Sequence, residues 1–292
     1  MKLEGVYTAL VTPMAANGAV DEKALRRLVD QQVEAGVSGI VPVGTTGESP
    51  TLDGDECKAV IRIVVEQARG RVQVIAGAGS NSTAEAIHYT QDAREVGADA
   101  TLHVAPYYNK PTNQGFLGHF RAIADAVDLP LIVYNIASRT GKNIDNPTML
   151  ELAAHRNIVG VKEASGDINQ VMDLVARKPA DFDVLSGDDN LAYPIIALGG
   201  VGVISVASNL IPDRMSALIK SAMKGDWASA RRMHYELLPF FRAIFIETNP
   251  IPIKAAMAMK GLITESYRLP MCPLAPKSRE SLSAVLQEMK IL

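Results

Sequence analysis

The feature that most constrains the fold is a regular alternation of short apolar runs with stretches of helical period. Eight apolar, β-branched runs recur along the first two thirds of the chain, near Val6, Gly39, Val72, Ala100, Leu131, Ile158, Phe182 and Val203. Between them apolar residues return every three or four positions, as on the buried face of a helix, for example over residues 21–35, 55–68, 83–96, 116–126 and 168–176. Eight such units predict an α/β fold, a (β/α)8 or TIM barrel, rather than an open sheet.

The chain changes character after residue 225. The strand signal stops, and three stretches with helical period follow, over residues 227–246, 252–260 and 277–289. No low-complexity linker separates them from the preceding units. We therefore expect a barrel over residues 1–225 and a helical extension packed on it over residues 226–292.

Composition and charge narrow the classes of partner. The formal charge of -3 comes from interspersed charges, so the sequence predicts no nucleic-acid surface, and it contains no apolar run typical of a membrane span. Cys57 and Cys272 are far apart and outside any Cys-x-x-Cys spacing, which favours a cytoplasmic location. The five histidines lack metal-ligand spacing. We expect small-molecule substrates and neither metal nor organic cofactor.

Polar residues follow several of the predicted strands. In barrels of this type the active site forms at the C-terminal ends of the strands. The polar segments at those ends are Gly44-Thr45-Thr46-Gly47-Glu48, Pro106-Tyr107-Tyr108-Asn109, Tyr134-Asn135, Lys162-Glu163 and Gly187-Asp188-Asp189. Each is a candidate wall of one pocket.

Lys162 is the strongest candidate for a catalytic residue because it ends the apolar run that begins at Ile158. Strand alternation puts Gly160 on the same face, where it leaves room beside the lysine, and puts Glu163 on the opposite face. A buried, unpaired ammonium has a pKa below the usual ~10.4, and the free amine is a nucleophile toward carbonyls. The alternative is a lysine that reaches the rim or pairs with a carboxylate.

Other strand-end residues each have a structural and a functional interpretation. Tyr134 could relay protons or simply pack with its hydroxyl bonded. The hydroxyls of Thr45 and Thr46 suit a carboxylate, yet they also suit helix capping. Arg139 could hold a carboxylate bidentately or remain solvated. We expect Asp188-Asp189 to place negative charge at a helix N-terminus rather than to bind a metal.

Five motifs occur in order along the chain. They are Gly44-Thr45-Thr46-Gly47-Glu48, Pro106-Tyr107-Tyr108-Asn109, Tyr134-Asn135 with Ser138-Arg139-Thr140-Gly141, Val161-Lys162-Glu163-Ala164, and Asn249-Pro250-Ile251-Pro252-Ile253-Lys254. Together they resemble the 4-hydroxy-tetrahydrodipicolinate synthase family, within the pyruvate-dependent class I aldolases that include N-acetylneuraminate lyase. The resemblance covers the whole chain.

The resemblance implies a reaction and roles for particular residues. Lys162 would form an imine with pyruvate, and the enamine would attack L-aspartate 4-semialdehyde in the first committed step of the diaminopimelate and lysine pathway. The imine is itself the electron sink, so no cofactor is implied. By carry-over, Thr46, Tyr134 and Tyr108 form a proton relay and Thr45 and Thr46 hold the pyruvate carboxylate. Arg139 receives the semialdehyde carboxylate, and Gly187 and Ile204 line the pocket.

The resemblance also implies an assembly. If extended, Tyr107 and Tyr108 point in opposite directions, which fits a family pattern in which a tyrosine reaches into a neighbouring subunit's site. We therefore expect a homotetramer built as a dimer of dimers.

Two departures from the family pattern matter. Ala137 stands where a proline is usual, which predicts a more mobile loop around Arg139. Ser49, Asn81, Glu85 and Tyr107 match the lysine-feedback pocket of sensitive family members. However, Gly54 and Cys57 occupy positions that are often histidine there, and Pro50 is unusual. We expect weak or absent inhibition by lysine.

Two rival functions remain open at this point. One is another aldolase of the superfamily, which would cleave N-acetylneuraminate or a 2-keto-3-deoxy sugar acid. The other is a barrel that binds phosphate or another ligand without covalent chemistry, through the glycines Gly187, Gly199, Gly200 and Gly202. The absence of Lys or Arg between Lys178 and Arg214 disfavours the second.

Overall fold

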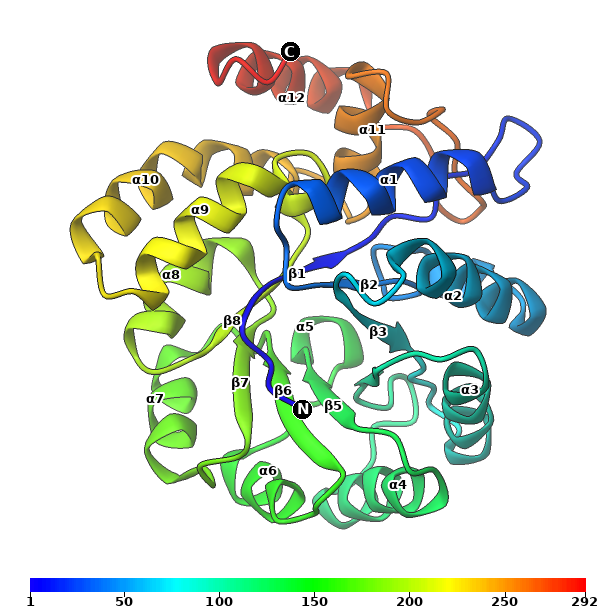
Figure 1. The fold of residues 1–292 in the computed structure, drawn as a ribbon, viewed down its shortest axis with the longest axis vertical. Coiled ribbons are helices and arrows are strands. Elements are labelled where there is room, and N and C mark those ends of the chain that lie inside the picture. Colours follow the sequence, from blue (N-terminus) through cyan, green and yellow to red (C-terminus); the bar gives the residue numbers. More distant parts are fainter.

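The computed structural model describes residues 1–292 and confirms the predicted barrel. Eight parallel strands pair in chain order, and β8 closes on β1, with the helices arranged around the outside (Figure 1). Each strand begins within one residue of its predicted position. The strands are β1 (Gly5–Ala9), β2 (Gly39–Val41), β3 (Gln73–Gly77), β4 (Ala100–Val104), β5 (Leu131–Asn135), β6 (Ile158–Glu163), β7 (Asp183–Ser186) and β8 (Gly202–Ser205).

One long helix follows each strand. These helices are α1 (Glu22–Glu34), α2 (Gly54–Ala68), α3 (Thr83–Glu95), α4 (Asn113–Ala126), α6 (Asn146–Ala153), α7 (Ile168–Arg177), α8 (Asp189–Ala197) and α9 (Pro212–Met223). Three short turns of helix lie in the loops that follow β2, β5 and β8, namely η1 (Ser49–Thr51), α5 (Ala137–Thr140) and η2 (Ala207–Asn209). Most of the long helices begin after a side chain that accepts a hydrogen bond from the first turn: Asp21, Asp53, Ser82, Thr112, Asp145 and Asp167.

The barrel interior is filled by one face of each strand. Ile132 and Tyr134 of β5 point inward and belong to the inner apolar cluster, whereas Val133 between them belongs to the outer cluster beneath the helices. On β6 the same alternation turns Lys162 inward and Glu163 outward, where Asn135 donates to its carboxylate. The interior is therefore a packed core with a cationic side chain at its upper end.

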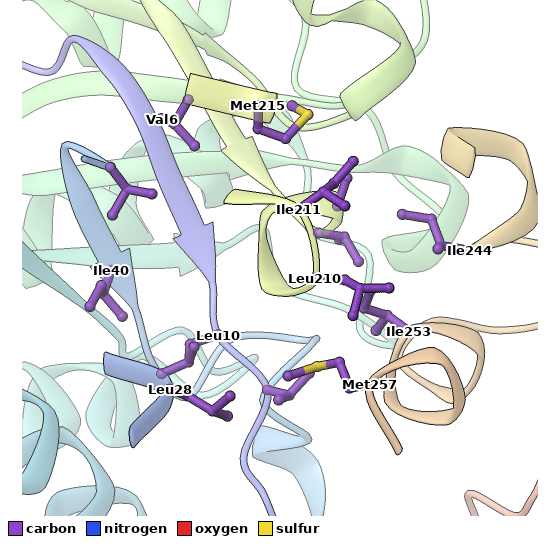
Figure 2. Close-up of a cluster of buried hydrophobic side chains, with 14 of the residues drawn as sticks. Val6, Leu10, Leu28, Ile40, Leu210, Ile211, Met215, Ile244, Ile253 and Met257 are labelled. Carbon is purple, nitrogen blue, oxygen red and sulfur yellow. The ribbon is translucent and has the colours of Figure 1, made fainter. Parts of the chain in front are cut away.

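Residues 226–292 form α10 (Trp227–Ala243), α11 (Ile251–Met259) and α12 (Pro276–Glu288). These helices pack at the side of the barrel where β1, α1 and α9 lie (Figure 1). Figure 2 shows Ile253 and Met257 of α11 in the same buried cluster as Leu10 and Leu210, which follow β1 and β8. The helices thus share one hydrophobic core with the barrel. None of the helices is both long and apolar enough to cross a membrane.

Candidate active site

A small cavity lies at the C-terminal end of the barrel. It measures about 50 Å³ and is bounded by strand ends and by the loop that follows β2. A water molecule needs about 10–15 Å³ on the same measure, so the cavity holds a molecule of only a few heavy atoms. Its polar walls include Thr45, Thr46, Tyr134 and Lys162. The predicted strand-end segments around β2, β5 and β6 therefore do meet in one site.

Lys162 is the only ionisable amine in this cavity, and it is 5% exposed. Its Nζ forms no ion pair and lies 4.1 Å from the centroid of the Tyr134 ring. The pKa of Lys162 is lowered from 10.5 to about 8, chiefly by burial; Asp188 and Asp189 oppose the shift, and Arg139 adds a smaller lowering. About a tenth of the molecules then carry a free amine at pH 7. The lysine neither reaches the rim nor pairs with a carboxylate.

The glycine that makes room for Lys162 is Gly187, not Gly160 as we expected. A Cβ at Gly160 would meet the Asp183 carbonyl and Leu3, which lie deeper in the barrel. A Cβ at Gly187 would lie 3.2 Å from Lys162 Cε and 2.7 Å from Ala164 Cβ. The difference arises because the lysine stem rises from β6 toward the end of β7, beyond the level of Gly160.

Replacing Gly187 by alanine is expected to slow imine formation about tenfold or more, because the new methyl displaces the amine from its position. The measurement is the rate at which pyruvate becomes trapped on Lys162 by a hydride reductant. Gly118→Ala is the matched control, since Gly118 is exposed on α4 and a Cβ there meets nothing within 4 Å. Equal trapping rates in the two variants would contradict this role for Gly187.

Tyr134 lies beside Lys162 on the neighbouring strand. It is 6% exposed, and burial raises the pKa of its phenol, so the hydroxyl stays protonated and can donate. The side chain that approaches this phenol is Thr45. The hydroxyl of Thr46 instead accepts a hydrogen bond from Asn249 Nδ2 at 3.0 Å. The arrangement differs from the expected relay, in which Thr46 is the partner of Tyr134.

The loop that carries both threonines is a tight turn after β2. Backbone bonds from Gly47 and Ser49 to the Gly44 carbonyl close it, at 3.0 and 3.3 Å. Glu48 has a left-handed backbone with φ of 57°, which turns its side chain inward, and its carboxylate is buried. The turn is thus rigid, and it presents its hydroxyls to the cavity.

Arg139 stands outside the small cavity. It lies in α5, is exposed, and lines an adjoining cavity of about 370 Å³. Its Nη2 donates to the Asn249 carbonyl at 3.3 Å. Ala137 begins α5, and backbone bonds to Ile136 and Ala137 close this short helix. The greater mobility of this loop stays a prediction.

The other sequence-predicted residues occupy different places. Ile204 is fully buried in the barrel interior, and Gly187 donates its N–H to the Glu163 carbonyl at 2.7 Å. Tyr107 lines the larger cavity and is held by Asn81, which donates to its carbonyl. Tyr108 has φ of 70° and is 91% exposed. Within one chain, Tyr108 is therefore not part of either cavity.

The larger cavity also contains most of the residues that match the lysine-feedback pocket. Ser49, Glu85 and Tyr107 line it, together with Pro50, Gly54 and Cys57. Asn81 is not among its walls, but it joins the Tyr107 segment through two hydrogen bonds. The two cavities share Thr45 and Ser49, so a ligand in the larger one would lie next to the lysine cavity.

Asp188 and Asp189 both lie at the N-terminus of α8, as expected, but neither side chain caps the helix with a hydrogen bond. Asp188 is at the N-cap of α8 but makes no capping hydrogen bond. Asp189 is buried and accepts from Ser205 Oγ at 2.5 Å and from the N–H of Ala207 at 2.9 Å, so it ties α8 to η2. Burial raises the pKa of Asp189 to about 6. The carboxylate therefore braces the loop after β8.

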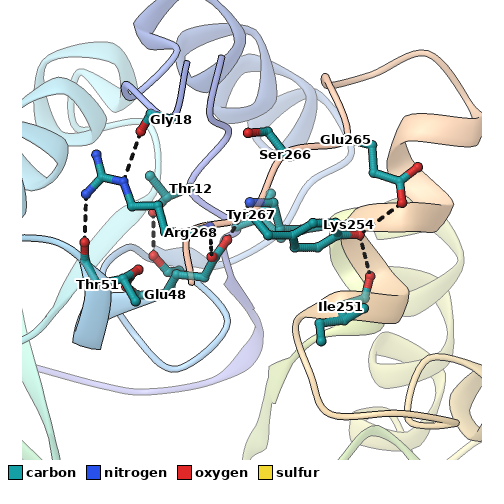
Figure 3. Close-up of polar contacts among 12 residues, drawn as sticks. Thr12, Gly18, Glu48, Thr51, Ile251, Lys254, Glu265, Ser266, Tyr267 and Arg268 are labelled. Carbon is teal, nitrogen blue, oxygen red and sulfur yellow. Dashed lines mark hydrogen bonds and ion pairs between the residues drawn. The ribbon is translucent and has the colours of Figure 1, made fainter. Parts of the chain in front are cut away.

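Sequence reasoning missed the role of the C-terminal segment. Lys254 is completely buried on α11 and pairs with the Glu48 carboxylate (Figure 3). Arg268 donates to the Thr51 carbonyl at 2.7 Å on the same side of the loop. A lysine inside the apolar run Ile251–Met259 was the available signal, since a lysine on the buried face of a helix is almost always paired.

Comparisons with known proteins agree with this geometry. The profile of the dihydrodipicolinate synthetase family matches residues 2–289. The 4-hydroxy-tetrahydrodipicolinate synthases of Koribacter versatilis and of Nitratidesulfovibrio vulgaris strain Miyazaki F are each 51% identical, over 100% and 98% of this chain and 98% of each relative. The chloride-inhibited dihydrodipicolinate synthase of Acinetobacter baumannii, solved with pyruvate, is 43% identical with a TM-score of 0.98, covering 100% of both chains. This chain therefore belongs to the dihydrodipicolinate synthetase family.

Proposed function

We propose that this chain condenses pyruvate with L-aspartate 4-semialdehyde, the 4-hydroxy-tetrahydrodipicolinate synthase reaction. The observation that carries the proposal is a buried amine with a lowered pKa, unpaired, in a cavity sized for a small acid. The names of relatives near 50% identity support this reaction over sugar-acid cleavage and over non-covalent binding. A structural neighbour complexed with pyruvate supports the first substrate.

The chemistry follows from the free amine. Lys162 Nζ attacks the keto carbon of pyruvate, and loss of water gives an iminium ion, which the adjacent face of Tyr134 stabilises. Loss of a methyl proton gives the enamine, whose carbon attacks the aldehyde. The substrate's own amino group then attacks the imine carbon, which closes the ring and releases Lys162. The sum is one pyruvate and one semialdehyde to one heterocycle and one water.

The polar walls take separate roles in this proposal. Tyr134, protonated at neutral pH, passes a proton to the oxygen that leaves as water, and Thr45 is its relay partner because it lies beside the phenol. Thr46 donates to the pyruvate carboxylate. Arg139 receives the semialdehyde carboxylate at the mouth of the site, where it faces the larger cavity.

Tyr108 completes the relay from a second copy of the chain. Its 91% exposure supports this, since a tyrosine this exposed in one chain is free to enter a neighbour's site. We propose the assembly to be a homotetramer of two tight dimers. Sedimentation velocity tests the assembly, and a monomer that retains full activity would exclude the shared relay.

The decisive experiment combines trapping with turnover. Borohydride added with pyruvate is expected to leave a reduced adduct on Lys162, located by peptide mass spectrometry. Turnover is then compared for the semialdehyde with pyruvate, for N-acetylneuraminate and for 2-keto-3-deoxygluconate. Trapping accompanied by sugar-acid cleavage and no condensation would assign the chain to a different aldolase reaction.

Lysine is expected to inhibit this enzyme weakly or not at all. Ser49, Glu85 and Tyr107 are present in the larger cavity, but Gly54 and Cys57 stand at positions often taken by histidine and bring no ring to contact a ligand. Inhibition is measured in a coupled assay with the semialdehyde, with rising lysine concentration. Half-inhibition at low micromolar lysine would contradict the prediction.

A further inference from the structure

We infer that Asn249 is a positioning residue that fixes the direction of the Thr46 hydroxyl and joins it to Arg139. The inference rests on the proposed function, because it assigns Thr46 a donor role toward the pyruvate carboxylate. Asn249 lies two residues before α11, far from the β2 loop in sequence. Nothing in the strand pattern places it near the site.

Asn249 makes its polar contacts to two site residues. Its side-chain Nδ2 donates to Thr46 Oγ1 at 3.0 Å, and its backbone carbonyl accepts from Arg139 Nη2 at 3.3 Å. Its Oδ1 is buried without a partner, so Thr46 is the only side chain that the amide holds. One residue therefore connects the group assigned to pyruvate with the group assigned to the semialdehyde.

The contact with Thr46 has a defined polarity. An amide nitrogen can only donate, so the Thr46 oxygen must accept, and its own proton must point elsewhere. Thr46 is 3% exposed and lines the small cavity, so little water competes for that proton. The geometry directs the hydroxyl as a donor into the cavity, where a substrate carboxylate would accept it.

The C-terminal segment is held firmly enough to do this. Lys254, five residues after Asn249, pairs with Glu48 at the end of the same loop (Figure 3). Arg268 contacts this loop through the Thr51 carbonyl, and it also pairs with the Glu56 carboxylate at the start of α2. These contacts fix both ends of the Asn249 to Thr46 bond, so the hydroxyl keeps one direction without reorganising when substrate binds.

Two substitutions of Asn249 test the polarity. Alanine removes the donor but leaves the Thr46 proton free to rotate toward substrate, and the pyruvate trapping rate at low pyruvate is expected to fall about fivefold to tenfold. Aspartate has nearly the same shape but only accepts, so the Thr46 proton turns toward it and away from the cavity. For Asn249→Asp the rate is expected to fall about a hundredfold. A merely structural role, or repulsion between the new carboxylate and pyruvate, predicts the same loss for Asn249→Asp whether or not Thr46 is present, so the Thr46→Val background decides between these explanations.

The controls separate this inference from its premises. Asn157→Asp makes the same chemical change at a remote position. Asn157 lies just before β6, at the opposite end of the barrel, where its Nδ2 donates to the Ala124 carbonyl, and this variant is expected to keep the wild-type rate within about twofold.

In a Thr46→Val background, Asn249→Asp is expected to add little further loss of the trapping rate. If Asn249→Asp does not fold, the comparison of Asn249→Ala in wild-type and Thr46→Val backgrounds decides, since independent losses would overturn the inference. A rate for Asn249→Asp at or above that of Asn249→Ala would overturn it too. If wild type forms no adduct, the proposed function itself fails, which is a distinct result.

Discussion

Lys162→Met is expected to abolish pyruvate trapping and to lower kcat for condensation about a hundredfold or more, without loss of stability. The amine is the atom that bonds to substrate, so no neighbouring group can replace it. Its pKa in the folded chain, about 8, lies below the ordinary 10.5, so at pH 7 the buried ammonium destabilises the folded state. Methionine fills a similar volume without charge. The melting temperature is therefore expected to stay unchanged or rise by a few degrees.

The pH dependence of trapping gives an independent check on the same lysine. The reacting form is the free amine, so the rate is expected to rise from pH 6.5 to pH 9 with a midpoint near the pKa of about 8. Wild-type protein is measured with pyruvate and a reductant whose own activity is corrected at each pH. A midpoint above pH 10 would show that burial does not lower the pKa of Lys162, and an adduct on the Lys162→Met variant would place the imine elsewhere.

Lys254→Met is expected to lower the free energy of unfolding by about 3–5 kcal/mol, because it leaves the buried Glu48 carboxylate without its partner. Both side chains are at most 1% exposed, so water cannot replace the lost contact. For a chain of this size the loss corresponds to a fall in melting temperature of roughly 6–15 °C. Burial lowers the pKa of Lys254, so the pair itself is not a strong source of stability; the cost arises from separating it.

The double variant Lys254→Met with Glu48→Gln separates the cost of leaving a buried charge unpaired from the cost of losing the packing of the lysine. It removes both charges and is expected to recover most of the lost stability, since a buried ion pair can be replaced by neutral groups at little cost. Chemical denaturation of the wild type, both single variants and the double variant completes the cycle. A double variant no more stable than Lys254→Met alone would mean that the lysine matters for packing rather than for its charge.

The strands show why so much of the fold could be predicted. The β-branched run that begins at Ile158 must be a strand, and its alternation alone turns Lys162 inward and Glu163 outward, as the structure confirms. Gly160 was wrong as the partner of the lysine stem. Alternation gives the face of a strand but not the height at which a long side chain meets the next strand, and at that height the free space comes from Gly187.

Part of the candidate site could likewise be predicted from the sequence, and part could not. Lys162, Tyr134 and the two threonines are strand-end residues, so the closed barrel brings them together as predicted. The resemblance assigned the relay to Thr46, whereas in the structure Thr45 lies beside the Tyr134 phenol and Thr46 bonds to Asn249. Tyr108 likewise has a positive φ that no periodicity predicts, and its side chain is exposed.

By itself the sequence determined the barrel, the order of its strands and the buried amine, because local period and strand ends depend only on neighbours along the chain. Only the tertiary structure decided that Asn249 holds Thr46 and that Lys254 holds Glu48, contacts that span more than 200 residues. A lysine in the apolar run of α11 favours an ion-pair partner but does not identify it. The partner is set by how α11 docks on the barrel, and that docking is directed by apolar packing that carries no information about charge.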